Sequence, residues 1–238
     1  MQRYGHHGQV PVPLITASWR RPAVVAVAAA VVVAVAMSVA LHHGYSTSFD
    51  TWLFDRFYEH IGSTGARLLI DTSQPVLSFL VPAAVVGFAV WTRRWNLAVL
   101  AVVGPLTALF VSEVVLKPLV GRYIGPGVLV GNHIDVVAGS FPSGHETGVC
   151  SAAFVVLIAL GGLRLRTGAR IATVLVLAVW ALLGAVGLVR NWYHYPTDTI
   201  GAVAVTTAVL LGVALLIDRV PRLSSPGVRS LASTSRGA

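Results

Sequence analysis

Two histidines and a carboxylate stand directly beside long apolar segments, where an ionisable side chain is costly to place. Residues 141–145 read Phe-Pro-Ser-Gly-His before one such segment, and residues 194–198 read His-Tyr-Pro-Thr-Asp before another. Ionisable groups retained beside apolar segments usually serve a function, so His145, His194 and Asp198 are the first candidates for chemistry.

His194 and Asp198 have the spacing of a supported nucleophile. Pro196 lies where a helix can begin, and one helical turn would bring the carboxylate beneath the imidazole. A carboxylate bonded to one ring nitrogen fixes the tautomer and leaves the other nitrogen free to attack. The pattern therefore predicts His194 as the nucleophile. The alternative is a solvated interface histidine followed by an aspartate at a helix start.

Residues 142–145 resemble the start of a helix that could bind an anion. Ser143 can cap the helix, Gly144 lets backbone approach a ligand closely, and the free N–H groups of the first turn point toward the ligand. The alternative is an ordinary cap followed by an interface histidine.

Fixed cations accompany these residues. Lys117 is the only lysine of the chain and comes four residues after Glu113. Arg122 precedes the segment that begins after His145, and Arg190 precedes His194 by four residues. A lone compact ammonium at the end of an apolar segment suggests a binding role, the alternative being an interface anchor paired with Glu113.

The elements that position these residues are six apolar blocks. Hydrophobic residues make up 55% of the chain and charged residues only 11%, which argues against a soluble domain. Each block has about the length needed to cross a hydrocarbon core. The predicted fold is all-α, a six-transmembrane helix bundle, with spans near residues 22–41, 75–91, 96–116, 147–163, 171–189 and 199–217.

The first block could be a secretory signal, but its length favours a retained anchor. Aromatic and aliphatic residues at helical spacing in the first outer loop predict a short interfacial helix there, either a scaffold element or a substrate gate. We expect residues 1–21 and 219–238 to form tails around one domain, residues 22–218.

The net charge of +8 reflects topology rather than a nucleic-acid partner. Of 17 basic residues, five (Arg56, Arg67, Lys117, Arg122 and Arg190) fall in the first, third and fifth connections, and the other twelve fall in the tails and the remaining connections. The positive-inside bias then predicts cytoplasmic termini and an active site on the outer face of the plasma (inner) membrane.

The lysine and arginine after one span, Pro-Ser-Gly-His before the next, and His-x-x-x-Asp one span later resemble the type 2 phosphatidic acid phosphatase family. The likeness covers about residues 22–218. It implies a metal-independent lipid phosphatase or pyrophosphatase without a cofactor. His194 would attack phosphorus, Asp198 would orient the His194 ring, and His145 would protonate the leaving oxygen. The phosphate would be held by Lys117, Arg122, Ser143, Gly144 and Arg190.

Two departures from the family pattern concern the arginines. The family has an arginine seven residues after the lysine; this chain has Ile124 at that position, and its arginine, Arg122, comes two positions early. The family also has a Ser-Arg pair before the last histidine; this chain has Gly187-Leu188 there, and its arginine, Arg190, comes two positions late. A non-catalytic membrane protein or transporter that binds a phosphorylated lipid is therefore the alternative function. A serine hydrolase using Ser143 and a haloperoxidase are weaker alternatives.

Overall fold

The chain is helical throughout the part that the computed structural model describes, which is residues 13–123, 139–163 and 165–220. No strand occurs in these residues. The helices are α1 Ala17–Ala40, α2 Ser48–His60, α3 Ser63–Asp71, α4 Pro75–Trp91, α5 Trp95–Phe110, the π-helical turn η1 Val111–Leu116, α6 Lys117–Val120, α7 Gly144–Gly161, α8 Thr167–Arg190 and α9 Pro196–Arg219.

Six segments of the described chain are long and apolar enough to cross a membrane. They are α1, α3 with α4, α5 through α6, α7, α8 and α9. Each contains or overlaps one of the six blocks expected from the sequence, so the prediction of an all-α six-span bundle is confirmed. The protein is therefore an integral membrane protein.

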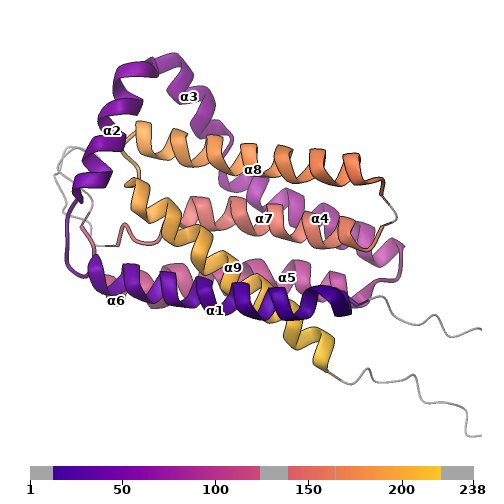
Figure 1. Ribbon diagram of the computed structural model, residues 1–238. Helices are drawn as coiled ribbons and strands as arrows, with labels where there is room; N and C mark the ends of the chain where they lie inside the picture. Colours follow the sequence, from indigo (N-terminus) through magenta and orange to yellow (C-terminus); the bar gives the residue numbers. More distant parts are fainter. Residues whose placement is uncertain (1–12, 124–138, 164, 221–238) are drawn as a thin grey trace, which may run out of the picture.

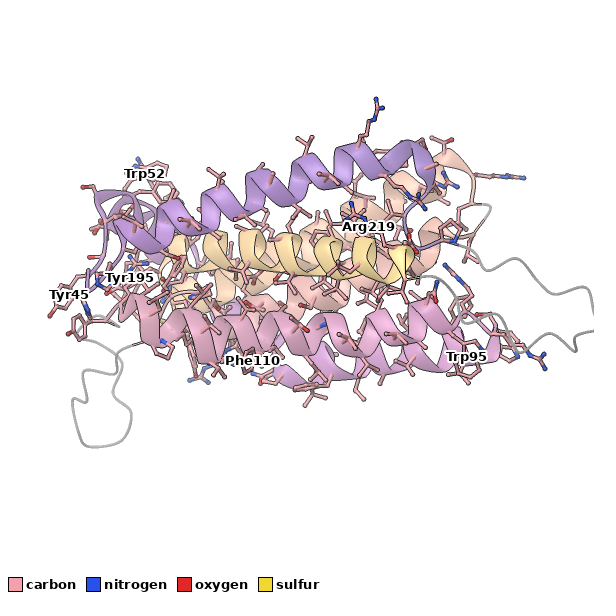
Figure 2. All side chains as sticks on the ribbon, turned by 90° about the horizontal axis from the view of Figure 1, so that it is seen from below. Tyr45, Trp52, Trp95, Phe110, Tyr195 and Arg219 are labelled. Atoms are coloured by element: carbon pink, nitrogen blue, oxygen red, sulfur yellow. The ribbon has the colours of Figure 1, made fainter. Side chains whose placement is uncertain are left out.

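The two ends of the bundle differ in what they carry. The long helices run side by side, α2 and α3 stand at one end, and α1 begins and α9 ends at the other (Figure 1). Tyr45, Trp52 and Tyr195 mark the first end, and Trp95 and Arg219 lie toward the second (Figure 2). The connections that contain the candidate residues all reach the end with α2 and α3.

The first connection forms two helices where one short helix was expected. Thr47 starts α2 through a capping box, in which its hydroxyl accepts from the Asp50 amide and the Asp50 carboxylate accepts from the Thr47 amide. The chain then breaks at Ile61 and Gly62, and α3 packs on α8. The Asn191 side chain donates to the Ala66 carbonyl, which fixes α3 beside the end of α8.

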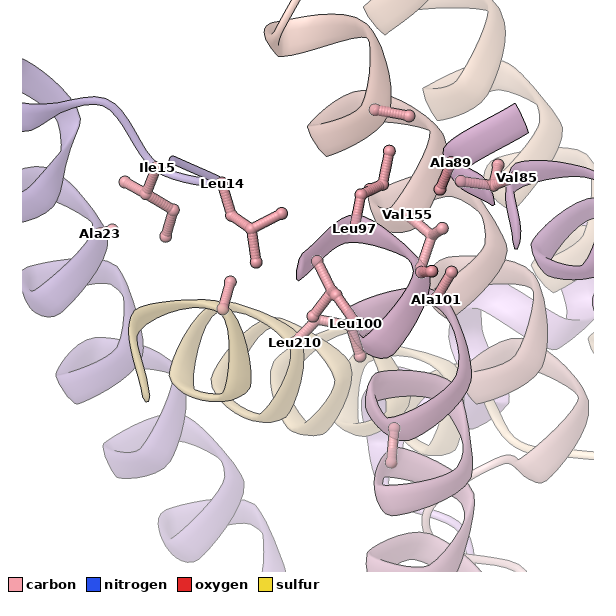
Figure 3. Close-up of a cluster of buried hydrophobic side chains, with 14 residues drawn as sticks. Leu14, Ile15, Ala23, Val85, Ala89, Leu97, Leu100, Ala101, Val155 and Leu210 are labelled. Carbon is pink, nitrogen blue, oxygen red and sulfur yellow. The ribbon is translucent and has the colours of Figure 1, made fainter. Parts of the chain in front are cut away.

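Helix α7 is the centre of the bundle. Of an 18-residue apolar stretch in α7, 61% of the residues are buried, against 11% for the corresponding stretch of α1. Helix α7 contacts α4, α5, α8 and α9. Residues such as Val85, Leu100, Val155 and Leu210 form the main core cluster (Figure 3). Small residues allow this close packing, since a Cβ at Gly104 would lie 2.5 Å from Leu210 Cδ1.

The same packing holds the loop before α7. Phe141 is completely buried, and its ring lies where a side chain on Gly201 of α9 would be, with an added Cβ only 2.1 Å from Phe141 Cε2. The loop that leads to His145 is therefore seated on the first turns of α9, which follow His194.

Candidate functional site

His194 lies between α8 and α9 with its ring orientation fixed. Nδ1 is 3.0 Å from the backbone carbonyl oxygen of Ser140, and the side chain is only 7% exposed. A carbonyl can only accept, so Nδ1 carries the proton and the lone pair is on Nε2. Ser140 is itself held by its amide, which donates to the Arg122 carbonyl at 3.1 Å.

Asp198 does not make the expected hydrogen bond to His194. Its Oδ2 is 3.6 Å from Nδ1, beyond hydrogen-bond range, and accepts instead from the Tyr195 amide at 3.0 Å. The carboxylate caps α9 because its position three residues after Tyr195 favours the N-terminal amide. Ser140, which the sequence did not single out, takes the tautomer-fixing position, and Asp198 adds negative charge nearby.

His145 lies in the first turn of α7, close to His194. The Ser143 hydroxyl accepts from the Glu146 amide at 3.3 Å, as expected of a cap, and the two histidine ring centroids are 6.4 Å apart. The Ser143 amide donates to the Asp198 carbonyl at 3.1 Å, which joins the starts of α7 and α9. The two histidines, 49 positions apart in sequence, thus share one site.

Lys117 lies beside the start of α7, near Gly144. Its Nζ lies 2.7 Å from Glu113 Oε2, and η1 holds this pair at the end of the third span. A Cβ added to Gly144 would lie 1.9 Å from Glu113 Oε1 and 3.7 Å from Lys117 Nζ. The carboxylate and the ammonium therefore lie against the backbone where α7 begins, and Lys117, Gly144 and His145 line one cavity of about 290 Å³.

Arg122 is placed differently from the expected phosphate ligand. Its side chain has no exposed surface, and it forms ion pairs with Asp50 and Asp198, with Nη2 2.7 Å from Asp50 Oδ2. The guanidinium also donates to the Tyr45 carbonyl and the Thr197 hydroxyl. The buried carboxylates of Asp50 and Asp198 attract the guanidinium into the protein interior. All three of its nitrogens therefore donate to protein acceptors.

Asp50 is a buried residue of the site that sequence reasoning missed. It accepts from the Thr197 amide at 2.9 Å as well as from Arg122, so it ties α2 to the start of α9. Burial raises the pKa of this carboxyl, but hydrogen bonds from Thr47 and Thr197 and the Arg122 charge outweigh burial and hold the pKa below its usual value. The capping-box spacing of Thr47 and Asp50 marks a helix start, but no sequence signal pairs Asp50 with Arg122.

Arg190 is also engaged away from the histidines. Its Nε donates to the Ile61 carbonyl at 2.9 Å, and its guanidinium carbon lies 4.2 Å from the centre of the Tyr58 ring. The break between α2 and α3 supplies this acceptor. Arg190 therefore secures the first connection to the end of α8, and it lines neither the cavity at His145 nor the one beside His194.

Glu146 is a second buried carboxylate that the sequence did not single out. It follows His145 in α7, is 1% exposed, and accepts from the Cys150 thiol at 3.3 Å. Its Oε2 has no hydrogen-bond partner among the described residues. Its position one residue after a candidate catalytic histidine could have drawn attention to it.

One family model matches more than half of the 238 residues. The PAP2 superfamily model covers residues 95–222, a range that contains both histidines, Lys117 and Asp198. Comparisons with curated proteins and with solved structures found no match.

Proposed function

Because the chain belongs to the PAP2 superfamily, a membership that implies phosphatase activity on phosphate esters, we propose that it hydrolyses a lipid phosphate ester through a phosphohistidine. The observation that carries the proposal is the approach of two histidines, with ring centroids 6.4 Å apart, one of them with its tautomer set by the Ser140 carbonyl. The proposal extends to pyrophosphate esters, which present the same terminal group.

The proposed reaction has two steps. His194 Nε2 attacks phosphorus, the bond from phosphorus to the lipid oxygen breaks, and His145 gives that oxygen a proton. His145 then takes a proton from water, the resulting hydroxide attacks phosphorus, and the bond to His194 breaks. In both steps the Nδ1–H of His194 keeps donating to the Ser140 carbonyl, and this hydrogen bond stabilises the positive charge that the ring acquires.

Lys117 and the start of α7 are the proposed phosphate contacts. The Lys117 ammonium lies beside Gly144, whose amide is among the free donors of the first turn of α7. The Ser143 hydroxyl is engaged as the cap, so its proposed role is to hold this turn. Arg122 and Arg190 are outside the proposed set because both guanidinium groups are bound to protein acceptors.

A lipid substrate fits the position of the site at one end of a membrane-spanning bundle. The cavity at His145 has apolar walls from Pro75, Phe79 and Leu109, and Phe79 is 58% exposed on the lipid-facing side. Arg20, Arg93 and Arg219 lie in or beside the opposite ends of the helices, so the positive-inside bias supports cytoplasmic termini and an outward-facing site. Plasma-membrane residence is part of the proposal.

Phosphate release by purified protein tests the function. Wild-type protein in detergent should release phosphate from phosphatidate or polyprenyl pyrophosphate, equally well with and without a metal chelator. His194→Ala should lower the rate at least about 10³-fold. His60→Ala is the matched control, since His60 is exposed at the same end of the molecule. Full activity in His194→Ala would refute the assignment.

A non-catalytic protein that binds phosphorylated lipid is the second candidate. The observation in its favour is that Arg122 and Arg190 are both bound to protein groups. Lys117 is then the lone lysine or arginine among the described residues that line the cavities at the two histidines. In that case a lipid phosphate would bind to wild-type protein, and no acid-labile phosphate would appear on His194 after rapid quenching.

A further inference from the structure

A second cavity lies beside His194, away from Lys117. It has a volume of about 290 Å³ and is enclosed by α2, the loop before α9 and Ser140. We name it the α2 cavity; the residues that matter to its chemistry are Thr51, Phe54, Asp55, Ser140, Trp192 and His194. The cavity at His145, which contains Lys117, is named the α4 cavity. A phosphorus atom between the two histidines therefore has room on both sides.

The walls of the α2 cavity suit a hydroxyl-rich group. Trp192 is held in a left-handed backbone conformation with φ 63°, and its ring centroid is 3.6 Å from that of Phe54, so the two form an aromatic wall. Strained backbone of this kind is often found at functional sites. The same cavity is lined by two α2 groups that accept or donate hydrogen bonds, the Asp55 carboxylate and the Thr51 hydroxyl.

Ser140 gives an independent indication of a ligand. Its side chain is completely buried, lines the α2 cavity, and its Oγ has no hydrogen-bond partner among the described residues. A buried hydroxyl normally has a partner, and a ligand hydroxyl in the cavity would supply one. An aromatic wall together with hydroxyl and carboxylate groups matches a polyol, which both donates and accepts hydrogen bonds.

The charge around the site favours a phosphate with a single negative charge. Among the described residues, Lys117 is the one lysine or arginine that lines the two cavities, and Glu113 pairs with it. Residues 124–138 contain no lysine or arginine. A phosphomonoester carries about −1.5 to −2 at pH 7, whereas a phosphodiester has no second ionisable proton and carries −1. The available counter-charge is thus better matched to the diester.

We infer that the substrate is a lipid phosphodiester, with its lipid chain in the α4 cavity and a hydroxylated head group in the α2 cavity. This inference rests on the proposed phosphohistidine chemistry. His194 Nε2 attacks phosphorus, the bond to the lipid oxygen breaks, and His145 protonates that oxygen, so the head-group phosphate stays on His194. Water then cleaves the bond from phosphorus to nitrogen, and the products are the lipid alcohol and the phosphorylated head group.

A matched set of lipids tests the substrate class. The full chain in detergent is given phosphatidylinositol, phosphatidylcholine and phosphatidate with identical acyl chains, and polyprenyl phosphoglucose and polyprenyl phosphate with identical chains. Mass spectrometry measures the lipid alcohol and the phosphorylated head group. In at least one of the two sets, the glycerolipids or the polyprenyl lipids, kcat/KM for the hydroxylated diester should exceed kcat/KM for the monoester by about tenfold or more.

Each other result has a defined meaning. Equal or faster hydrolysis of the monoester overturns the diester inference and leaves the proposed phosphatase function standing. A preference for phosphatidylcholine overturns the polyol assignment of the α2 cavity. Turnover of none of these lipids, with wild-type protein folded, counts against the proposed function itself and the inference with it.

Variants of the α2 cavity give a second readout. Asp55→Asn and Trp192→Gly should each lower kcat/KM for the hydroxylated diester by about tenfold, and lower its ratio to the monoester value by about fivefold. Glycine at position 192 accommodates the left-handed backbone, which limits damage to the fold. Arg56→Gln is the control, because Arg56 is exposed on α2 and lines neither cavity. An equal loss for both substrates in the two cavity variants overturns the head-group assignment.

Discussion

Replacement of Arg122 by methionine should destabilise the protein much more than it weakens substrate binding. The Arg122 side chain is fully buried between Asp50 and Asp198, whose side chains also have no exposed surface. Loss of the guanidinium leaves two carboxylates uncompensated, and removal of one partner from a buried ion pair typically costs about 3–5 kcal/mol. At about 2–4 °C per kcal/mol for a chain of this size, the melting temperature should fall by about 6–20 °C.

A double-mutant cycle isolates the ion pair. Thermal unfolding in detergent is followed for wild type, Arg122→Met, Asp50→Asn and the double variant, with the exposed Arg56→Gln as control. Because asparagine removes one of the uncompensated charges, the double variant should be less destabilised than the sum of the single variants by about 1–3 kcal/mol. A melting temperature of Arg122→Met within about 2 °C of wild type, together with a raised KM, would show that Arg122 binds substrate phosphate instead.

Three further predictions concern the same end of the molecule. Gly144→Ala should lower kcat/KM at least about tenfold, because the alanine methyl would displace the Glu113 carboxylate. The double variant Gly144→Ala with Glu113→Ala removes that clash and should regain part of the rate. No regain would exclude the clash as the cause. Gly201→Ala should lower the free energy of unfolding by about 1–3 kcal/mol, since its methyl overlaps the Phe141 ring, and an unchanged melting temperature would contradict that contact. Asp50, with its pKa below the usual 3.8, should contribute stability that is present above pH 3.8 and lost as the pH falls through the lowered value. Melting temperatures measured down this range should therefore fall more steeply for wild type than for Asp50→Asn, and parallel curves would contradict the pKa assignment.

Much of the architecture could be predicted because it depends on local properties. Each span is a stretch of apolar residues of sufficient length, and a helix satisfies its own backbone hydrogen bonds inside lipid, so length and composition suffice. That His145 and His194 lie at the same end also followed from this topology, because two spans, α7 and α8, separate them and an even number of crossings returns the chain to the same end. The Ser143 cap was predictable too, because its acceptor and donor lie three residues apart.

The partners of the arginines could not be predicted in this way. Arg122 bonds to Asp198, 76 positions away, and Asp50 bonds to Thr197, 147 positions away. Nothing in either local sequence marks these pairs, and comparison with a motif suggested phosphate as the partner. The break at Ile61, which gives Arg190 its acceptor, was likewise not expected within the single helix predicted there.

The sequence by itself determined that this chain spans a membrane six times and brings two histidines to one end, because hydrophobic length and helical spacing are properties of contiguous residues. Only the tertiary structure decided which group orients His194, which carboxylates neutralise Arg122, and where cavities remain beside the histidines. These depend on distances between loops that are remote in sequence, and a difference of less than 1 Å separates the hydrogen bond of His194 to Ser140 from its longer approach to Asp198.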